Sequence, residues 1–210
     1  VLISAIFPGG LSLLPDATEA RVLLESQAVT ASGFRGIKDS ALRNLFNLHR
    51  TVARGARVEK ESALHIRTVP EEIDFAFRAI HIMLSGEPAV DEAVLEVTRE
   101  KVVSSIGATV MQPSYRFLKA SNELVWPGRR FGNGDLDVED LDAVDADWIN
   151  SSSRVLFRNV NGAWFHVSGP IDLDTVESYA NTYIGSRPGG ERRQEAEFTA
   201  PHATTSGEAR

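Results

Sequence analysis

The chain has 210 residues, of which 42% are hydrophobic and 24% charged, so it can bury a core without disulfides or metal ions. Its net charge of -7 argues against a nucleic-acid partner, because phosphate binding needs a basic patch. The absence of cysteine excludes disulfides, thiolate zinc ligands and thiol nucleophiles. No apolar run approaches the roughly 20 residues of a membrane span, and no signal peptide is visible, which leaves the compartment open.

Hydrophobic periodicity predicts a chain with few strands and many helices. In chain order, the predicted elements are a strand over 1–7, helices over 16–31 and 40–52, a hairpin over 51–69, helices over 70–84, 90–111 and 113–126, short helices from 137 and 145, a strand over 163–169 and a helix from 172 to 185. Strands this widely separated by helices favour an α+β fold, with helices packed on one face of a mostly antiparallel sheet.

Capping signals mark several helix starts. Asp16 and Thr68 each precede a glutamate by three positions, as in a capping box, and each is predicted to begin a helix. Short helices are expected to start at Asp137 and Asp145, and Asp172 is predicted to cap the last helix.

The domain organisation follows from a change in composition near the C-terminus. We expect residues 1–187 to form one domain, and the polar, Gly-rich and charged residues 188–210 to be a tail or an interdomain linker. Because the residues after Val1 already have the composition of a strand interior, we expect the chain to be a fragment of a longer polypeptide.

The turn Pro8-Gly9-Gly10 lies between the first strand and the first helix, where nucleotide-binding proteins place a phosphate loop. Two adjacent glycines without a lysine match neither glycine-rich signature of such loops. The turn is therefore interpreted as a loop that needs positive φ or a close backbone approach.

Other candidate sites are weak. The five histidines lack metal-ligand spacing, so structural roles are expected for His49, His65, His81, His166 and His202. The acidic run from Asp135 to Asp147 fails the EF-hand pattern and is interpreted as helix caps and solvated faces. Arg129 and Arg130 beside Phe131 form only a short anion-site candidate, and the serines at 151–153 lack a nucleophile elbow.

Three stretches, in the right order and spacing, resemble the insulinase/pitrilysin-like zinc metallopeptidases. "AIFPGGLSLLPDATEA" at 5–20 is similar to the "S/A-F-S-P-G-G-L-S-L-L-P-D" stretch of non-catalytic repeats in that family. The two other stretches are "VPEEIDFAFRAIHIMLSGEPAVDEAV" and "SSSRVLFRNVNGAWFHVSGPIDLDTVESYANTYIGSRP" at 151–188. The resemblance covers roughly residues 1–190 and implies the α+β sandwich already expected from the pattern.

The resemblance also indicates what this chain lacks. Active members carry H-x-x-E-H on the first helix, where two histidines bind zinc and the glutamate activates water. An ungapped comparison places Val22 and Ser26 at the two histidine positions and Glu25 at the glutamate position. Valine has no donor atom and a neutral serine hydroxyl is a poor zinc ligand, so no catalytic, cofactor-binding or metal site is expected. Glu25 is interpreted as a relic or a surface helix residue.

The resemblance implies a non-catalytic domain, most similar to the first domain of the C-terminal half of such a peptidase. Its implied partners are the catalytic half, which would hold the zinc, and peptide substrate enclosed between the halves. The alternative is a stand-alone scaffold or processing-peptidase-type subunit; a binding domain without a peptidase connection is a third option. Family domains begin with further strands before the position of Val1, and a sheet edge clipped there would invite strand addition or dimerisation.

Overall fold

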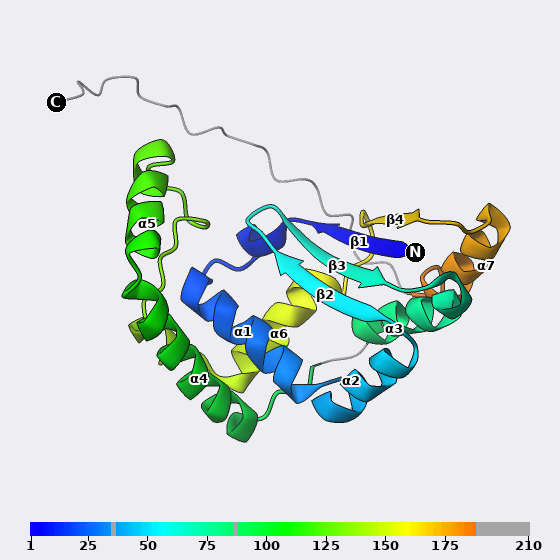
Figure 1. The fold of residues 1–210 in the computed structure, drawn as a ribbon, viewed down its shortest axis with the longest axis horizontal. Coiled ribbons are helices and arrows are strands. Elements are labelled where there is room, and N and C mark those ends of the chain that lie inside the picture. Colours follow the sequence, from blue (N-terminus) through cyan, green and yellow to red (C-terminus); the bar gives the residue numbers. More distant parts are fainter. Residues whose placement is uncertain (35–36, 86–87, 188–210) are drawn as a thin grey trace.

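The computed structural model describes residues 1–34, 37–85 and 88–187. Figure 1 shows a four-stranded sheet in the order β2-β3-β1-β4, with every neighbouring pair antiparallel. The elements are β1 (Leu2–Pro8), η1 (Gly10–Leu13), α1 (Glu19–Ser32), α2 (Asp39–Leu48), β2 (Val52–Arg57), β3 (Glu61–Arg67), η2 (Pro70–Glu72), α3 (Ile73–Ser85), α4 (Glu92–Val110), α5 (Pro113–Val125), η3 (Glu139–Leu141), α6 (Ala146–Phe157), β4 (Trp164–Ser168) and α7 (Leu173–Tyr183). The predicted α+β class is confirmed; the predicted tail over 188–210 lies outside the described residues.

One face of the sheet forms the first hydrophobic core. The two-residue alternation of β1 directs Ile3, Ala5 and Phe7 to this face, where all three are fully buried. Ile66 of β3 lies opposite Ile3, and the Phe7 ring meets the ring of Phe157 from α6 edge-on, with centroids 5.8 Å apart. Helices α3, α6 and α7 complete this core, so the inner face of the sheet is covered by helices.

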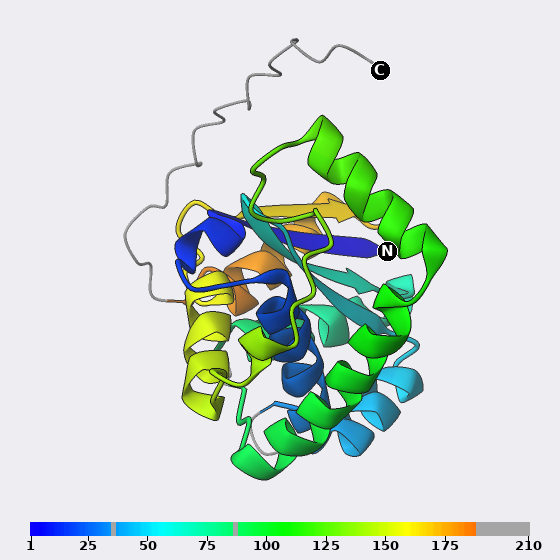
Figure 2. The same ribbon diagram turned by 90° about the vertical axis from the view of Figure 1, so that its left-hand side faces the viewer.

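A second core surrounds α1. Leu24 of α1 is fully buried among Leu95, Val102 and Ile106 of α4 and Ile149 of α6. Figure 2 shows α1 between α4 and α6. Helix α1 is thus packed between helices on two sides, and it lies away from the face of the sheet that no helix covers. None of the described helices combines the length and hydropathy that crossing a bilayer requires.

The strand that follows Val1 does not form a sheet edge. β1 is paired with β3 on one side and with β4 on the other, so the edges of the described sheet are β2 and β4. Strand addition or dimerisation at a sheet edge would therefore have to use β2 or β4.

Two predicted caps are wrong. The side chain of Thr18, rather than that of Asp16, accepts a hydrogen bond from the N–H of Arg21 and caps α1. The Thr68 hydroxyl caps no helix, because it pairs with the buried Thr51 hydroxyl at 2.8 Å. Thr51 also lies beyond the end of α2, which stops at Leu48 instead of continuing to 52.

The Pro8-Gly9-Gly10 turn joins the first strand to the β2–β3 hairpin by backbone contacts. The N–H of Gly9 donates to the Lys60 carbonyl at 2.7 Å, and the N–H of Leu11 donates to the Val58 carbonyl at 2.9 Å. Gly10 has a φ of 48°, and a Cβ added there would lie 2.3 Å from the Glu61 nitrogen. The expectation of positive φ and close backbone approach is confirmed.

The close approach at Gly10 predicts a strong effect of a single methyl group. We expect Gly10→Ala to lower the free energy of unfolding by roughly 1–3 kcal/mol, because the left-handed backbone and the contact with the hairpin both disfavour a Cβ. Gly107→Ala is the matched control: an added Cβ meets nothing within 4 Å in α4, so stability should rise by up to about 1 kcal/mol. Urea unfolding of both variants checks the prediction, and equal effects of the same sign would contradict it.

The N-cap of α7 predicts a pH dependence. Hydrogen bonds from the side chain and backbone of Thr175 lower the pKa of the Asp172 carboxyl. A carboxyl whose pKa is lower in the folded state stabilises the fold above its unfolded pKa, and this contribution disappears as the pH falls through the folded pKa. We therefore expect Asp172→Asn, which keeps an N-cap but does not titrate, to lose less Tm than the wild type between about pH 6 and about pH 3. Equal losses in thermal unfolding would show that Asp172 is not responsible.

Candidate functional site

The three residues at the positions of the zinc-binding motif share one side of α1. Val22, Glu25 and Ser26 are spaced i, i+3 and i+4, which places their side chains next to one another on a helix. Val22 and Ser26 line a hollow of about 500 Å³, and Gly55 and Arg57 of β2 line its other side. The site therefore lies where α1 faces the end of the edge strand β2.

A buried ion pair occupies this place. Arg57 Nε lies 2.6 Å from Glu25 Oε2, and Arg57 Nη2 donates to Glu25 Oε1 at 3.1 Å. Only 2% of the Glu25 side chain and 9% of the Arg57 side chain are exposed. The guanidinium therefore engages both carboxylate oxygens away from water, where an unpaired charge would be costly.

Two residues of α6 complete the surroundings of the pair. The Ser153 hydroxyl donates to Glu25 Oε1 at 2.6 Å, and the Arg57 guanidinium carbon lies 5.0 Å from the centroid of the Phe157 ring. The ring face attracts the cation, and the hydroxyl supplies a further donor to the carboxylate. Ser153 is itself buried and committed to Glu25, so it is not presented to a substrate.

The interpretation of Glu25 as a surface helix residue is wrong. It is 1% exposed, and its partners come from β2 and α6, far along the chain. Analysis of the sequence missed Arg57 and Ser153 altogether. The available signals were a glutamate within the apolar side of α1, next to Leu24, and an arginine at a core-facing position of β2.

The residues around Glu25 do not fit a zinc ion. Val22 offers no donor, Ser26 offers a neutral hydroxyl, and the Arg57 cation already neutralises the one carboxylate. Within 1–34, 37–85 and 88–187, no three His, Asp or Glu side chains come together as a metal-binding group. The Arg57 side chain is thus a second obstacle to metal binding, in addition to Val22 and Ser26, which are not zinc ligands.

The other candidates have structural roles. Arg130 donates to the Leu14 carbonyl at 2.7 Å and to the Ala17 carbonyl at 3.0 Å, which ties the 127–135 loop to the start of α1. Asp145 caps α6 as predicted, accepting from the Trp148 N–H at 2.7 Å. Asp135 holds Lys119 at 2.7 Å, and this hydrogen bond raises the pKa of the lysine.

Most of the histidines also make local contacts. His49 Nδ1 lies 2.7 Å from Glu72 Oε2, and its ring stacks on Phe75. His81 Nδ1 lies 2.7 Å from the Tyr183 carbonyl, which joins α3 to α7. His65 and His166 project from the uncovered face of the sheet, where His65 Nδ1 lies 3.0 Å from Ser4 Oγ, and His202 lies outside the described residues.

A larger hollow of about 670 Å³ lies under α2, on the other side of the ion pair. Its walls come from α1, α2, β2, α3 and α6 and are mainly apolar, with Phe46, Phe75 and Phe157 among them. Arg57 lines both hollows, so the ion pair forms part of the wall between them.

Comparison with solved structures identifies the fold. No protein-family model matches the sequence, and no curated protein is similar to it. The chain superposes on the peptidase M16 inactive domain from Pseudomonas fluorescens with a TM-score of 0.73 and 14% identity, over 93% of this chain and 47% of that one. The periplasmic protease PqqL from Escherichia coli matches with a TM-score of 0.72 and 14% identity, over 93% of this chain and 21% of that one. Pitrilysin matches with a TM-score of 0.61 and 18% identity, over 95% of this chain and 22% of that one.

These matches define the fold of the chain. The chain has the α+β fold of M16 peptidase and pitrilysin structures, and inactive domains are among the structures that share it. The resemblance inferred from the three sequence stretches is confirmed at the level of the fold. The chain spans between 21% and 47% of the length of the structures it matches.

The ion pair predicts strong coupling between two residues. We expect Arg57→Met to lower the free energy of unfolding by roughly 3–5 kcal/mol, because it leaves the Glu25 carboxylate buried without its cation. Glu25→Leu should lower it by a similar amount, because it leaves the Arg57 guanidinium buried without its anion. The free energy of unfolding of the double variant Glu25→Leu/Arg57→Met should lie within about 2 kcal/mol of the wild-type value, since apolar side chains then fill the site. Urea unfolding of the four proteins measures the coupling; simple additivity of the single losses would contradict it.

Proposed function

We propose that this chain is a non-catalytic domain of an insulinase/pitrilysin-like zinc metalloendopeptidase. The observation that carries the proposal is the cation in the site: the Arg57 guanidinium holds Glu25 beside Val22 and Ser26, where an active member would hold zinc. A carboxylate bound by Arg57 and by the Ser153 hydroxyl, next to Val22 and Ser26 instead of two histidines, lacks the surroundings of a metallopeptidase general base.

The proposed role is structural. The domain would pack with the catalytic half of the parent polypeptide and contribute a wall of the space that encloses peptide substrate, in the position of the first domain of the C-terminal half. Zinc would be held by the catalytic domain of the parent and not by this chain. The coverage of 47% of an M16 inactive domain structure supports a chain that works as one unit among several.

The absence of fitting ligands predicts the metal content of the chain. After incubation with Zn²⁺ and gel filtration, we expect far less than one zinc per chain by elemental analysis, and no cleavage of an unstructured peptide. Val22→His/Ser26→His, which restores the H-x-x-E-H pattern, is still expected to bind zinc weakly, because Arg57 holds the glutamate and repels the ion. Stoichiometric zinc with peptide cleavage by the unaltered chain would refute the proposal.

The partner is tested by co-purification with the catalytic half. If the parent reading frame encodes an H-x-x-E-H domain, that domain co-expressed with this chain should form a stable complex and cleave peptide faster than it does alone. A parent without such a motif would instead favour the alternative, a stand-alone scaffold or processing-peptidase-type subunit.

A further inference from the structure

The face of the sheet that the helices leave uncovered carries a row of basic and polar side chains. The strand register places Arg54 opposite His65, His65 opposite Ser4, and Ser4 opposite His166. These four residues alternate with the core-facing positions of their strands, so they all project from the uncovered face, where Ser4 is 7% exposed between its neighbours. We call this surface the open face; it also includes Leu2, Ile6, Val52, Ala56, Glu61, Ala63, Arg67, Trp164 and Ser168.

Two further rows run beside the first, each displaced by two residues, or roughly 7 Å, along the strands. On one side Arg67 lies opposite both Val52 and Leu2. On the other side Ile6 lies opposite both Ala63 and Trp164, and Trp164 is 67% exposed. The open face therefore carries basic side chains in its central row and at Arg67, with apolar side chains beside them in both outer rows.

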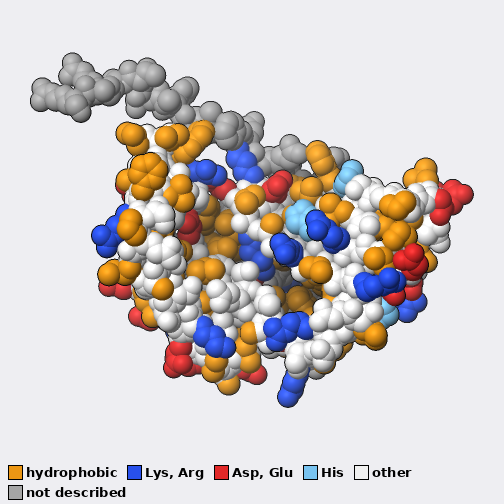
Figure 3. Space-filling view, viewed as in Figure 1, with side chains coloured by type: hydrophobic (Ala, Val, Ile, Leu, Met, Phe, Trp, Pro, Cys, Tyr) orange, Lys and Arg blue, Asp and Glu red, His pale blue; other side chains and the backbone are white. Residues whose placement is uncertain are grey.

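The charge of the open face is opposite to that of the chain. Arg54 and Arg67 are its cations, and Glu61, at the far end of β3, is its single acidic residue among the described strands. The chain as a whole has a net charge of -7. In the space-filling view, Lys, Arg and His side chains gather over the sheet (Figure 3). Such a local reversal of charge attracts anionic partners.

The neighbouring polar groups are arranged as further donors. Ser4 Oγ lies 3.0 Å from His65 Nδ1, which orients that imidazole within the row, while His166 is exposed on β4. No helix of the described residues covers this row, so arginine and imidazole N–H groups can reach an acceptor above the sheet.

We propose that the open face binds acidic polypeptide segments. Carboxylates would lie over Arg54 and Arg67, with His65 and His166 as additional donors, and apolar side chains of the ligand would pack on Ile6 and Trp164. A permanent interface would be mainly apolar, whereas a surface with two arginines and only a few apolar side chains suits a reversibly bound ligand. The inference deepens the proposed function, on which it rests for the origin of the ligand: peptide substrate held before cleavage.

The test is a titration of the 210-residue chain with a fluorescein-labelled peptide of about a dozen residues repeating Glu-Leu-Glu-Ser, at about 50 mM salt. Fluorescence anisotropy should show saturable binding that weakens at about 0.3 M salt, and the same peptide with Lys in place of Glu should not bind. Failure of the Glu peptide to bind, or equal binding of both peptides, would overturn the proposal.

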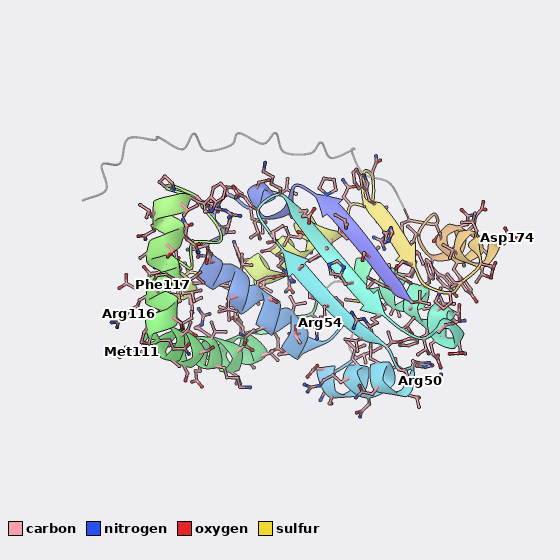
Figure 4. All side chains as sticks on the ribbon, turned by 45° about the horizontal axis from the view of Figure 1, so that its top comes forward. Arg50, Arg54, Met111, Arg116, Phe117 and Asp174 are labelled. Atoms are coloured by element: carbon pink, nitrogen blue, oxygen red, sulfur yellow. The ribbon has the colours of Figure 1, made fainter. Side chains whose placement is uncertain are left out.

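Matched variants distinguish binding to the open face from a general effect of the net charge of the chain. Arg54→Glu/Arg67→Glu should raise the Kd by at least about tenfold, whereas Lys101→Glu/Arg116→Glu, with the same charge change on α4 and α5, should change it less than about twofold. Figure 4 labels Arg54 on β2 and Arg116 on α5, on the far side of α1. Equal losses in both variants would refute the assignment to the open face.

Two controls keep the test independent of folding and of the proposed function. Arg54→Gln/Arg67→Gln, a milder change at exposed positions, should weaken binding in the same direction if the reversed-charge variant is unstable. Co-purification with the catalytic half is measured separately. A chain that forms the complex but ignores the acidic peptide refutes only this inference; a chain that binds the peptide but forms no complex refutes only the proposed function.

Discussion

The contact between Glu25 and Arg57 joins the two halves of the architecture. Glu25 belongs to α1, whose other buried residues pack against α4 and α6, and Arg57 ends β2 of the sheet. Two buried charges need each other and further polar contacts, and here Ser153 donates to the Glu25 carboxylate and the Phe157 ring lies against the Arg57 guanidinium, both from a third element. The pair therefore fixes the position of α1, the edge strand and α6 relative to one another.

The position of Arg57 depends in turn on the loop that precedes α1. The hairpin turn after Arg57 is hydrogen-bonded to the backbone of Gly9 and Leu11, and only glycine at position 10 allows the two backbones to approach this closely. The glycine pair thus acts on the site from a distance: it holds the turn, the turn places the end of β2, and β2 delivers the guanidinium to α1. This loop lies where nucleotide-binding proteins have a phosphate loop, but here its backbone packs against the β2–β3 hairpin.

Periodicity was sufficient to predict the order of helices and strands, because each amphipathic segment carries that information locally. Caps were predictable where the acid contacts only its own helix, as at Asp145 and Asp172. They were not predictable where a residue far along the chain binds the predicted capping side chains. The Glu19 carboxylate accepts from the Asn133 N–H at 2.8 Å, and Thr68 pairs with Thr51. The burial of Glu25 followed from contacts with β2 and α6, which no local window contains. The sequence resemblance drew attention to the side of α1 that carries Val22, Glu25 and Ser26, and only the structure revealed that Arg57 contacts it.

The same strand supplies basic residues for opposite purposes. β2 alternates, so Arg57 points to the covered face and is neutralised by Glu25, whereas Arg54 points to the open face, among imidazoles and arginine with a single acid at the far end. A positive charge that is paired with a carboxylate in this way is neutralised and contributes mainly to structure. An exposed positive charge without a nearby acid keeps its field available to a partner. Recognition of a partner would therefore depend on outward-facing residues such as Arg54, whereas the inward-facing Arg57 holds the end of β2 against α1.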